Sequence, residues 1–252
     1  MSKFSDLNVV VTGGAGGIGT ACAKSFIEEG AHVFLLDLPG DALEQVTSQL
    51  SSTGQVTSIP CDVSDRSSVE EAFDRIEAQG GTDVLVTTAA IVKAAPILEF
   101  DPDEWERILQ VNLTGTFHCC QLAGRQMVAK GRGRIITLGS INGQVANTGR
   151  GAYSCTKGGV DMLTRLLAAE LGDKGITANV VAPAPVDTPM IVKVHGRKER
   201  EVWENKIPAK RYAQPHEVAA TVMFLASDEA AYINGHVLNV DGGFIASGIL
   251  LR

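Results

Sequence analysis

The sequence predicts an α/β protein built on one doubly wound, seven-stranded parallel sheet with helices on both faces. Three observations lead to this fold class. Short runs rich in Val, Ile and Leu alternate with longer segments of helical periodicity, the first apolar run ends in a glycine-rich turn, and 44% hydrophobic content over 252 residues can bury a large core. Because no linker, low-complexity tract or internal repeat interrupts the chain, we expect a single domain over residues 1–252.

Seven apolar runs are predicted as strands, since continuous Val, Ile and Leu suit a sheet that is covered on both faces, which is a parallel one. The helical segments between them supply right-handed crossovers. Ligands bind at the carboxyl ends of the strands in this architecture, so function is expected there. The predicted strands are 8–13, 32–37, 56–63, 83–89, 134–140, 177–184 and 236–243, and the predicted helices lie near 18–29, 41–50, 66–79, 102–130, 153–172 and 215–227.

The first strand runs into the stretch TGGAGGIG, residues 12–19. Glycines 14, 16 and 19 match G-x-G-x-x-G, and Gly13, Gly17 and Gly19 match T-G-x-x-x-G-x-G equally well. In either pattern the missing Cβ atoms let a pyrophosphate approach the backbone, and the next helix presents its free N–H groups to it. Because the turn follows a strand and opens a helix, it predicts a Rossmann-type nucleotide-binding unit.

The second strand ends at Asp37, 18 residues after Gly19. A carboxylate at this position accepts hydrogen bonds from the adenosine ribose hydroxyls and repels a 2′-phosphate. Leu38 and Pro39 are uncharged, and the glycine turn holds no arginine. We therefore expect NAD rather than NADP as the cofactor. The alternative is a strand-end aspartate that only caps a turn.

The stretch GAYSCTKGGV, residues 151–160, places Tyr153 four residues before Lys157 in a predicted helix. Helical spacing puts both side chains on one face. Lowering a tyrosine pKa from about 10 to near neutrality requires about 3–4 kcal/mol. A positive charge about 4 Å away supplies about 4 kcal/mol at an effective dielectric of about 20. We expect Lys157 to make the phenol a usable base, and a chance pair on a surface helix is the alternative.

The glycine turn and the Tyr153–Lys157 pair occur in order with further motifs, among them CDVS (61–64), QVNLTGTF (110–117) and NVDGGF (239–244). With these motifs, the chain resembles the classical short-chain dehydrogenase/reductase family over essentially its whole length. The resemblance implies a catalytic tetrad of Asn112, Ser140, Tyr153 and Lys157. Tyr153 would exchange a proton with the substrate oxygen, Ser140 would hydrogen-bond that oxygen, Lys157 would also hold the nicotinamide ribose, and Asn112 would hold a water of a proton relay. The implied activity is NAD-dependent interconversion of a secondary alcohol and its carbonyl by hydride transfer. The matching segments are TGGAGGIG, CDVS (61–64), QVNLTGTF (110–117), RIITLGS (134–140), YSCTK (153–157), ITANVVAP (176–183) and NVDGGF (239–244).

The same resemblance implies cofactor contacts beyond the glycine turn, Asp37, Tyr153 and Lys157. Ile18 is expected on the pyrophosphate or nicotinamide side, and Asp62 and Val63 match the pair that contacts adenine. Further contacts are implied by Val186 and Thr188, which match residues that bind the nicotinamide carboxamide.

Two departures from the family pattern lie where the cofactor is held. TTAA (87–90) replaces the usual NNAG, so Thr88 keeps a hydroxyl for a cofactor contact whereas Ala90 replaces a glycine. PA replaces the usual PG, which places Ala184 after the sixth strand. These departures bear on cofactor affinity more than on chemistry, and they keep open an alternative of another class, a nucleotide-binding sensor or scaffold with little turnover. The enzyme rival is a 3-oxoacyl-(acyl-carrier-protein) reductase, which normally draws on NADPH, and Asp37 speaks against it.

The segment 188–212 is expected to form a lid over the substrate, as the resemblance implies. Its part from 190 to 212 carries seven Lys or Arg against three Glu, a balance that would steer an anionic substrate. A solvated helix of alternating charges is the alternative. The loop 140–153 is expected opposite the lid, and the substrate candidates are Asn142, Gln144, Arg150 and Trp203. Polar walls favour a small polyol, sugar or hydroxy acid over a steroid or long acyl chain.

Composition and charge set the remaining expectations. A net charge of −7 without a basic stripe gives no reason to expect a nucleic-acid partner. The short apolar run at the N-terminus predicts neither a signal peptide nor a membrane span. Five cysteines without C-x-x-C spacing indicate reduced thiols in a cytoplasmic protein, and the scattered histidines predict no metal site. The resemblance implies a homotetramer paired through 102–130, 153–172 and the apolar tail FIASGILLR (244–252).

Overall fold

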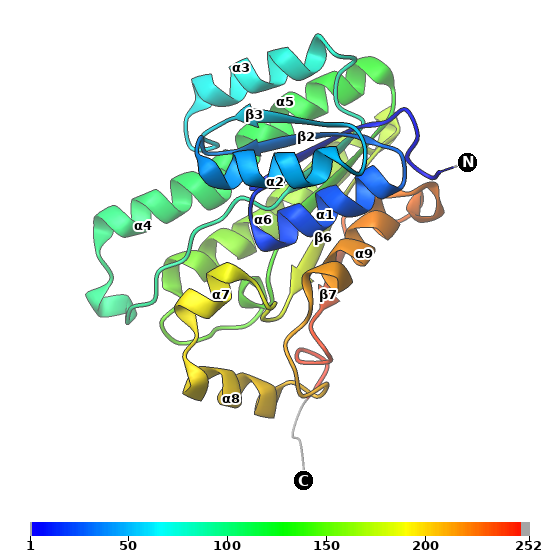
Figure 1. The fold of residues 1–252 in the computed structure, drawn as a ribbon. Coiled ribbons are helices and arrows are strands. Elements are labelled where there is room, and N and C mark those ends of the chain that lie inside the picture. Colours follow the sequence, from blue (N-terminus) through cyan, green and yellow to red (C-terminus); the bar gives the residue numbers. More distant parts are fainter. Residues whose placement is uncertain (1, 248–252) are drawn as a thin grey trace.

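The computed structural model describes residues 2–247. Within them seven parallel strands form one sheet in the order β3-β2-β1-β4-β5-β6-β7, which confirms the predicted fold class (Figure 1). The strand order reverses between β1 and β4, and this switch point opens a crevice at their carboxyl ends. The strands are β1 Asn8–Thr12, β2 His32–Asp37, β3 Val56–Pro60, β4 Val84–Thr87, β5 Gly133–Leu138, β6 Ile176–Pro183 and β7 Val237–Val240.

The continuous apolar runs arise because each strand is buried on both faces. Val9 and Val11 pack in one core with α1, α2 and α9, whereas Val10 between them packs in a second core with α3 and α5. In Figure 1, α1 and α9 lie side by side, and they contact each other closely. The helices are α1 Gly17–Glu28, α2 Asp41–Ser51, α3 Arg66–Glu77, α4 Pro102–Leu109, α5 Gly115–Lys130, α6 Gly151–Leu171, α7 Pro189–Val194, α8 Arg197–Lys206 and α9 Pro215–Ala226.

The segment predicted as helix-like near 102–130 is helical throughout, but it is not regular α-helix along its whole length. A π-helical turn over Gln110–Thr114 separates α4 from α5. The wider turn carries the fully buried side chain of Asn112, and the Asn112 carbonyl accepts a hydrogen bond from the Thr116 hydroxyl at 2.7 Å. Single π-turns inside helices commonly mark functional positions. The sequence held the polar residue that marks this turn but no signal for its changed hydrogen-bond pattern.

Helix α6 turns an unusual stripe of side chains toward the sheet. Small and β-branched residues such as Val160 and Thr164 are buried there, together with the charged residues Lys157 and Asp161. Thr164 shares a hydrogen bond of 2.7 Å with Thr137 of β5, which satisfies both hydroxyls in the core. The spacing of four residues thus aligns Tyr153, Lys157 and Asp161 along one side of the helix.

The segment expected to be a lid contains α7 and α8 and lies at one end of the molecule, away from α3 (Figure 1). Two ion pairs lie within α8, since Arg200 contacts Glu204 at 2.9 Å and Arg197 contacts Glu201 at 3.1 Å, and Arg200 also contacts Asp187 at 2.7 Å. These pairs favour the solvated helix of alternating charges over a broad steering surface.

The remaining features concern the capacity of the helices to cross a membrane and the C-terminal tail. Within residues 2–247 no helix combines the length and the apolar composition that crossing a membrane requires. The last five residues of the apolar tail, 248–252, lie outside the described residues, so the predicted role of the tail in subunit contact is not addressed by the structure.

Candidate active site

The glycine turn after β1 is packed so tightly that side chains are excluded from it. Gly13 has φ +65°, and a Cβ there would lie 2.6 Å from the backbone nitrogen of Ala89. A Cβ on Gly17 would lie 2.8 Å from the Thr188 methyl. The Thr88 hydroxyl donates to the Thr12 carbonyl at 2.7 Å, so this predicted cofactor residue ties the turn to β4.

Asp37 lies at the carboxyl end of β2, beside the glycine turn. Its Oδ2 accepts a hydrogen bond from the Ala15 backbone at 2.9 Å, and its Oδ1 accepts one from Leu38 at 2.8 Å. Asp62 and Val63 line the same groove, with Asp62 also accepting from Ser64. The structure therefore brings the predicted adenosine-side residues together.

The groove continues along the strand ends toward Tyr153 and Lys157. Its two parts share Gly13, Gly16, Thr88, Ala90 and Met190, so they are contiguous. Ile18 and Thr188 line the second part, whereas Val186 is buried and lines the neighbouring pocket instead. The groove has the glycine turn along it, the Asp37 carboxylate at one end and Lys157 at the other. This arrangement fits an extended dinucleotide.

Asn112 is fixed by the backbone of the loop after β4. Its Oδ1 accepts from the Ile91 nitrogen at 2.8 Å, and its Nδ2 donates to the Ile91 carbonyl at 2.9 Å. The same Nδ2 lies 3.3 Å from the Thr156 hydroxyl on α6. The side chain is fully buried, so the amide joins three segments of the site. Ile91 was missed at the sequence level because a backbone partner leaves no residue signal, and Thr156 was missed because its hydroxyl meets Asn112 only in the fold.

Tyr153, Lys157 and Ser140 converge where α6 meets the end of β5. The Lys157 side chain is only 4% exposed, and its Nζ donates to the Leu138 carbonyl at 2.6 Å. The same Nζ lies over the Tyr153 ring, 5.6 Å from its centroid. Ser140 accepts a hydrogen bond from the Asn142 backbone at 3.1 Å and lines the pocket with Tyr153.

The charges around Tyr153 differ from the expectation. Burial raises the pKa of Tyr153, and the opposing effects come from hydrogen bonding to Ser140 and from the charge of Arg150. Lys157 is not among the groups that lower this pKa, and its ammonium lies over the ring, 5.6 Å from the centroid. Burial also lowers the pKa of Lys157 to about 8, while nearby Asp161 raises it.

Asp161 is a feature that the motifs did not reveal. The residue is 5% exposed, and its Oδ1 has no hydrogen-bond partner within the described chain. The carboxylate fits only because residue 139 is glycine, whose added Cβ would lie 2.8 Å from Oδ1. Burial raises the pKa of Asp161 to about 6, and the charges of Arg165 and Lys157 oppose this. A spacing of four from Lys157 was the available sequence signal.

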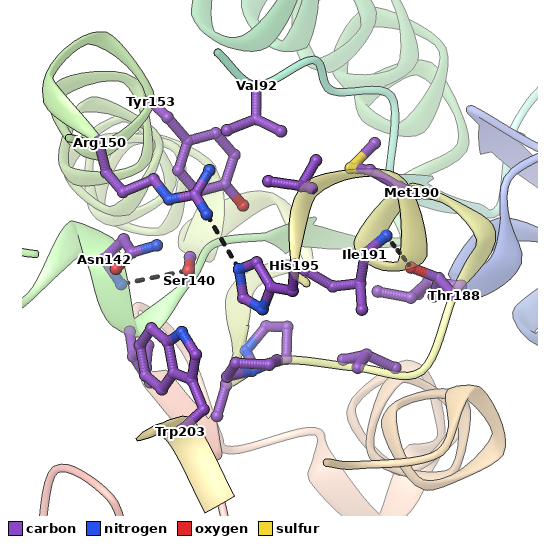
Figure 2. A pocket seen from close by; sticks show the side chains of 17 residues that line it. Val92, Ser140, Asn142, Arg150, Tyr153, Thr188, Met190, Ile191, His195 and Trp203 are labelled. Atoms are coloured by element: carbon purple, nitrogen blue, oxygen red, sulfur yellow. Dashed lines mark hydrogen bonds between the residues drawn. The ribbon is translucent and has the colours of Figure 1, made fainter. Parts of the chain in front are cut away.

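A second cavity opens beside the tyrosine and encloses roughly 680 Å³, including space open to solvent (Figure 2). Asn142, Arg150 and Trp203 line it as predicted. Gln144, the fourth substrate candidate, does not line it, because its amide is exposed and donates to Asn239 at 2.6 Å. The expected polar character is also only partly right, since α7 supplies an apolar wall.

Known proteins match this arrangement across nearly the whole chain. A family model described as Enoyl-(Acyl carrier protein) reductase matches residues 13–245. A D-threitol dehydrogenase of Mycolicibacterium smegmatis is 38% identical over 237 residues, which cover 93% of this chain and 91% of the relative. This chain belongs to the short-chain dehydrogenase/reductase family.

Other members of the family are similar to a comparable degree. A cis-4-hydroxycyclohexanecarboxylate dehydrogenase of Sinomonas cyclohexanicum is 38% identical and covers 96% of this chain and 98% of its own. A 3-oxoacyl-[acyl-carrier-protein] reductase of Thermotoga maritima is 34% identical, with coverages of 94% and 96%. A gluconate 5-dehydrogenase from Burkholderia cenocepacia, solved with NADP and tartrate, superposes with a TM-score of 0.93 at 31% identity, covering 98% of both chains.

As a short-chain dehydrogenase/reductase, the protein is an oxidoreductase that uses a nicotinamide cofactor to interconvert an alcohol and a carbonyl. Of the two departures from the family pattern, Ala90 lines the cofactor groove. Ala184 instead packs against Ile141 and Ile207 and borders the substrate pocket. Within residues 2–247, no three His, Cys, Asp or Glu side chains gather in a group able to hold a metal ion.

Proposed function

We propose that the protein is an NAD-dependent dehydrogenase that oxidises the secondary alcohol of a small hydroxylated substrate, with Tyr153 as its acid/base. The observation that carries this proposal is the convergence of Tyr153, Ser140 and Lys157 at the junction of the cofactor groove and the substrate pocket. The intact set of groups favours an enzyme over a sensor or scaffold with little turnover.

The residues divide the chemistry among them. Bound NAD supplies the hydride acceptor for alcohol oxidation. Tyr153 accepts the proton of the substrate hydroxyl, and Ser140 donates a hydrogen bond to the oxygen as its charge develops. Lys157 contributes a buried positive charge close to the phenol. Asn112 fixes the loop at Ile91 and supports the proton relay beyond Lys157.

Asp37 supports NAD as the cofactor. Its Oδ2 accepts from the Ala15 backbone of the turn and its Oδ1 from the Leu38 backbone, and the residue lines the groove. A carboxylate so placed accepts from ribose hydroxyls and repels a 2′-phosphate. The arginine that lines this end of the groove, Arg107, is mostly exposed and faces Glu104 at 3.5 Å. The NADP-bound structural relative makes a direct cofactor comparison necessary.

The second enzyme candidate is a 3-oxoacyl-(acyl-carrier-protein) reductase, since a relative with that activity is 34% identical. Asp37 speaks against it because that reaction normally draws on NADPH. Relatives that act on threitol or on a cyclic hydroxy acid agree better with a compact pocket for a small molecule.

The test is NADH formation followed by near-UV absorbance. Wild-type protein and Tyr153→Phe are mixed with NAD⁺ or NADP⁺ and a panel of polyols, sugars, hydroxy acids and simple secondary alcohols. We expect turnover with NAD⁺ that falls about 10²- to 10⁴-fold in the variant, because the phenylalanine cannot take the proton. Preference for NADP⁺ would refute the role of Asp37, and no turnover with either cofactor would refute the proposal.

Two further proposals accompany this function. We infer a homotetramer, supported by exposed apolar side chains on the two long helices, namely Phe117 on α5 and Met162 and Leu166 on α6. Light scattering coupled to size exclusion measures the mass, and a monomer would contradict it.

We also infer a cytoplasmic location, which free cysteines support and which cell fractionation tests.

A further inference from the structure

The substrate pocket contains a guanidinium without an anionic partner. Arg150 lies at the N-cap of α6, three residues before Tyr153, and both side chains line the pocket (Figure 2). Across residues 2–247 no carboxylate pairs with Arg150, and its Nη2 forms a hydrogen bond of 2.9 Å with His195 Nε2. Two arginines of the adjoining lid, in contrast, have anionic partners. Arg200 forms a salt bridge with Asp187, and Arg211 forms one with Glu217.

His195 cannot neutralise this charge. Arginine has donors only, so Nε2 of His195 must carry the lone pair that accepts the bond. The proton of the neutral ring is then on Nδ1, which donates to the Tyr212 hydroxyl at 2.8 Å. Burial, followed by the charge of Arg150, lowers the pKa of His195, in agreement with a neutral ring. The guanidinium fork therefore keeps its positive charge and further N–H donors.

The rest of the pocket suits a hydrocarbon body more than a chain with a hydroxyl on every carbon. Met190, Ile191 and Val194 of α7 form one wall, with Pro185 beside them. Each substrate hydroxyl placed against such a wall would lose its hydrogen bonds to water without replacement. The polar groups gather instead near Arg150 and around Ser140 and Tyr153.

We propose that Arg150 binds a carboxylate of the substrate, so that the enzyme acts on hydroxy acids with a largely apolar carbon skeleton. The inference rests on the proposed function and deepens it. A spacing of three residues puts Arg150 and Tyr153 on one side of the helix start, so one small molecule presents its carboxylate to the arginine and its hydroxyl to the tyrosine. Two parallel N–H···O bonds from the fork match a carboxylate.

The first test compares each acid with its own carboxamide, which removes the charge and keeps the shape. The pairs are cis-4-hydroxycyclohexanecarboxylate and 3-hydroxybutyrate with their amides, oxidised with NAD⁺. For the wild type we expect kcat/KM to favour the acid by about 10- to 100-fold. Arg150→Gln should bring this ratio close to one, and Arg150→Lys should keep part of it because the charge remains.

The matched control is Arg197→Gln, which makes the same change of charge on α8. Arg197 is 93% exposed and pairs with Glu201, so this variant should retain the acid preference of the wild type. A wild type that oxidises amides as well as acids would overturn the inference. So would an Arg150→Gln variant that loses both activities in equal proportion.

A binding measurement keeps the inference separate from the proposed function. Cyclohexanecarboxylate lacks a hydroxyl and cannot react, so calorimetry in the presence of NAD⁺ reports recognition alone. We expect the carboxylate to bind the wild type at least about 10-fold more tightly than Arg150→Gln, with no such difference for cyclohexanecarboxamide. Equal binding to both proteins, or none, would overturn the inference. Charge-dependent binding without turnover of any alcohol would support the inference and refute the proposed function.

Discussion

Arg150 and Lys157 flank Tyr153 in the sequence, and these two cations are held in different ways. Lys157 is buried within α6 and donates to the Leu138 carbonyl of β5, so the framework of the sheet fixes it. Arg150 is half-buried at the helix start, and its recorded partner is the neutral His195 between α7 and α8. One cation belongs to the rigid sheet, and the other is bound to the segment expected to move.

The difference shows how one helix can serve chemistry and selection separately. A charge tied to a buried carbonyl keeps its place whatever substrate arrives, which suits a group that acts in every turnover. A charge held by a single bond to a lid residue can add or exchange partners when a ligand enters. The two roles are not fully separate, because the charge of Arg150 also lowers the pKa of Tyr153.

The largest expected effect comes from giving both cations the same substitution. Lys157→Gln should lower kcat by about 10²- to 10⁴-fold for acids and amides alike, because the positive charge near the phenolate is lost. Arg150→Gln should mainly raise KM, and this increase should be larger for acids than for their amides. Steady-state kcat and KM for both variants with one acid and its amide measure the separation. If Arg150→Gln lowered kcat for the amide as strongly as Lys157→Gln, the two cations would share one role.

How far the sequence predicts this site depends on the range of each interaction. The spacing within α6 predicts that Tyr153 and Lys157 share a face, because helical geometry is local. The same spacing points to Asp161, but nothing in the sequence shows that the carboxylate would be buried against Gly139. The seven strands were found because burial on both faces leaves a continuous apolar pattern.

Long-range contacts were beyond the sequence. Arg150 and His195 are 45 positions apart, and only the folded lid brings them together. The sequence did not show that Gln144 lies outside the pocket, because a polar residue in a loop carries no information on direction, and its amide turns toward Asn239. The π-turn at Asn112 was missed since it changes hydrogen bonding without changing composition.

The buried carboxylate of Asp161, next to Lys157, is expected to lower the free energy of unfolding of the folded protein. Asp161 has a folded-state pKa of about 6 against 3.8 when unperturbed, so folding disfavours its charged form. The charged carboxylate therefore destabilises the folded state. This destabilisation is absent below pH 3.8, develops between pH 3.8 and 6, and is complete above pH 6. Asp161→Asn should therefore stabilise the protein by about 3 kcal/mol at pH 7, and the gain should vanish near pH 4. Urea unfolding at several pH values measures it.

A matched control for Asp161→Asn is Asp83→Asn. Asp83 is also buried, at 6% exposure, but it pairs with Lys130 at 2.5 Å and Arg132 at 3.3 Å, so its loss should destabilise the protein. Asp161→Asn should also lower the pKa of Lys157 below about 8, since Asp161 raises it. Activity at pH 8 relative to pH 6.5 should fall accordingly. Destabilisation by Asp161→Asn at pH 7 would contradict this account of the framework.

The smallest effect is expected on the lid side, at His195. His195→Phe keeps a ring to stack on Trp203, where the two ring planes lie 8° apart, but removes both the acceptor for Arg150 and the donor to the Tyr212 hydroxyl. We expect KM for an acid to rise by no more than about 10-fold, because one hydrogen bond that orients the guanidinium is lost while its charge remains. His195→Gln, which restores an acceptor, should recover part of the loss. A fall in KM would instead mean that His195 competes with the substrate for the fork, and the lid would then restrain Arg150 rather than prepare it.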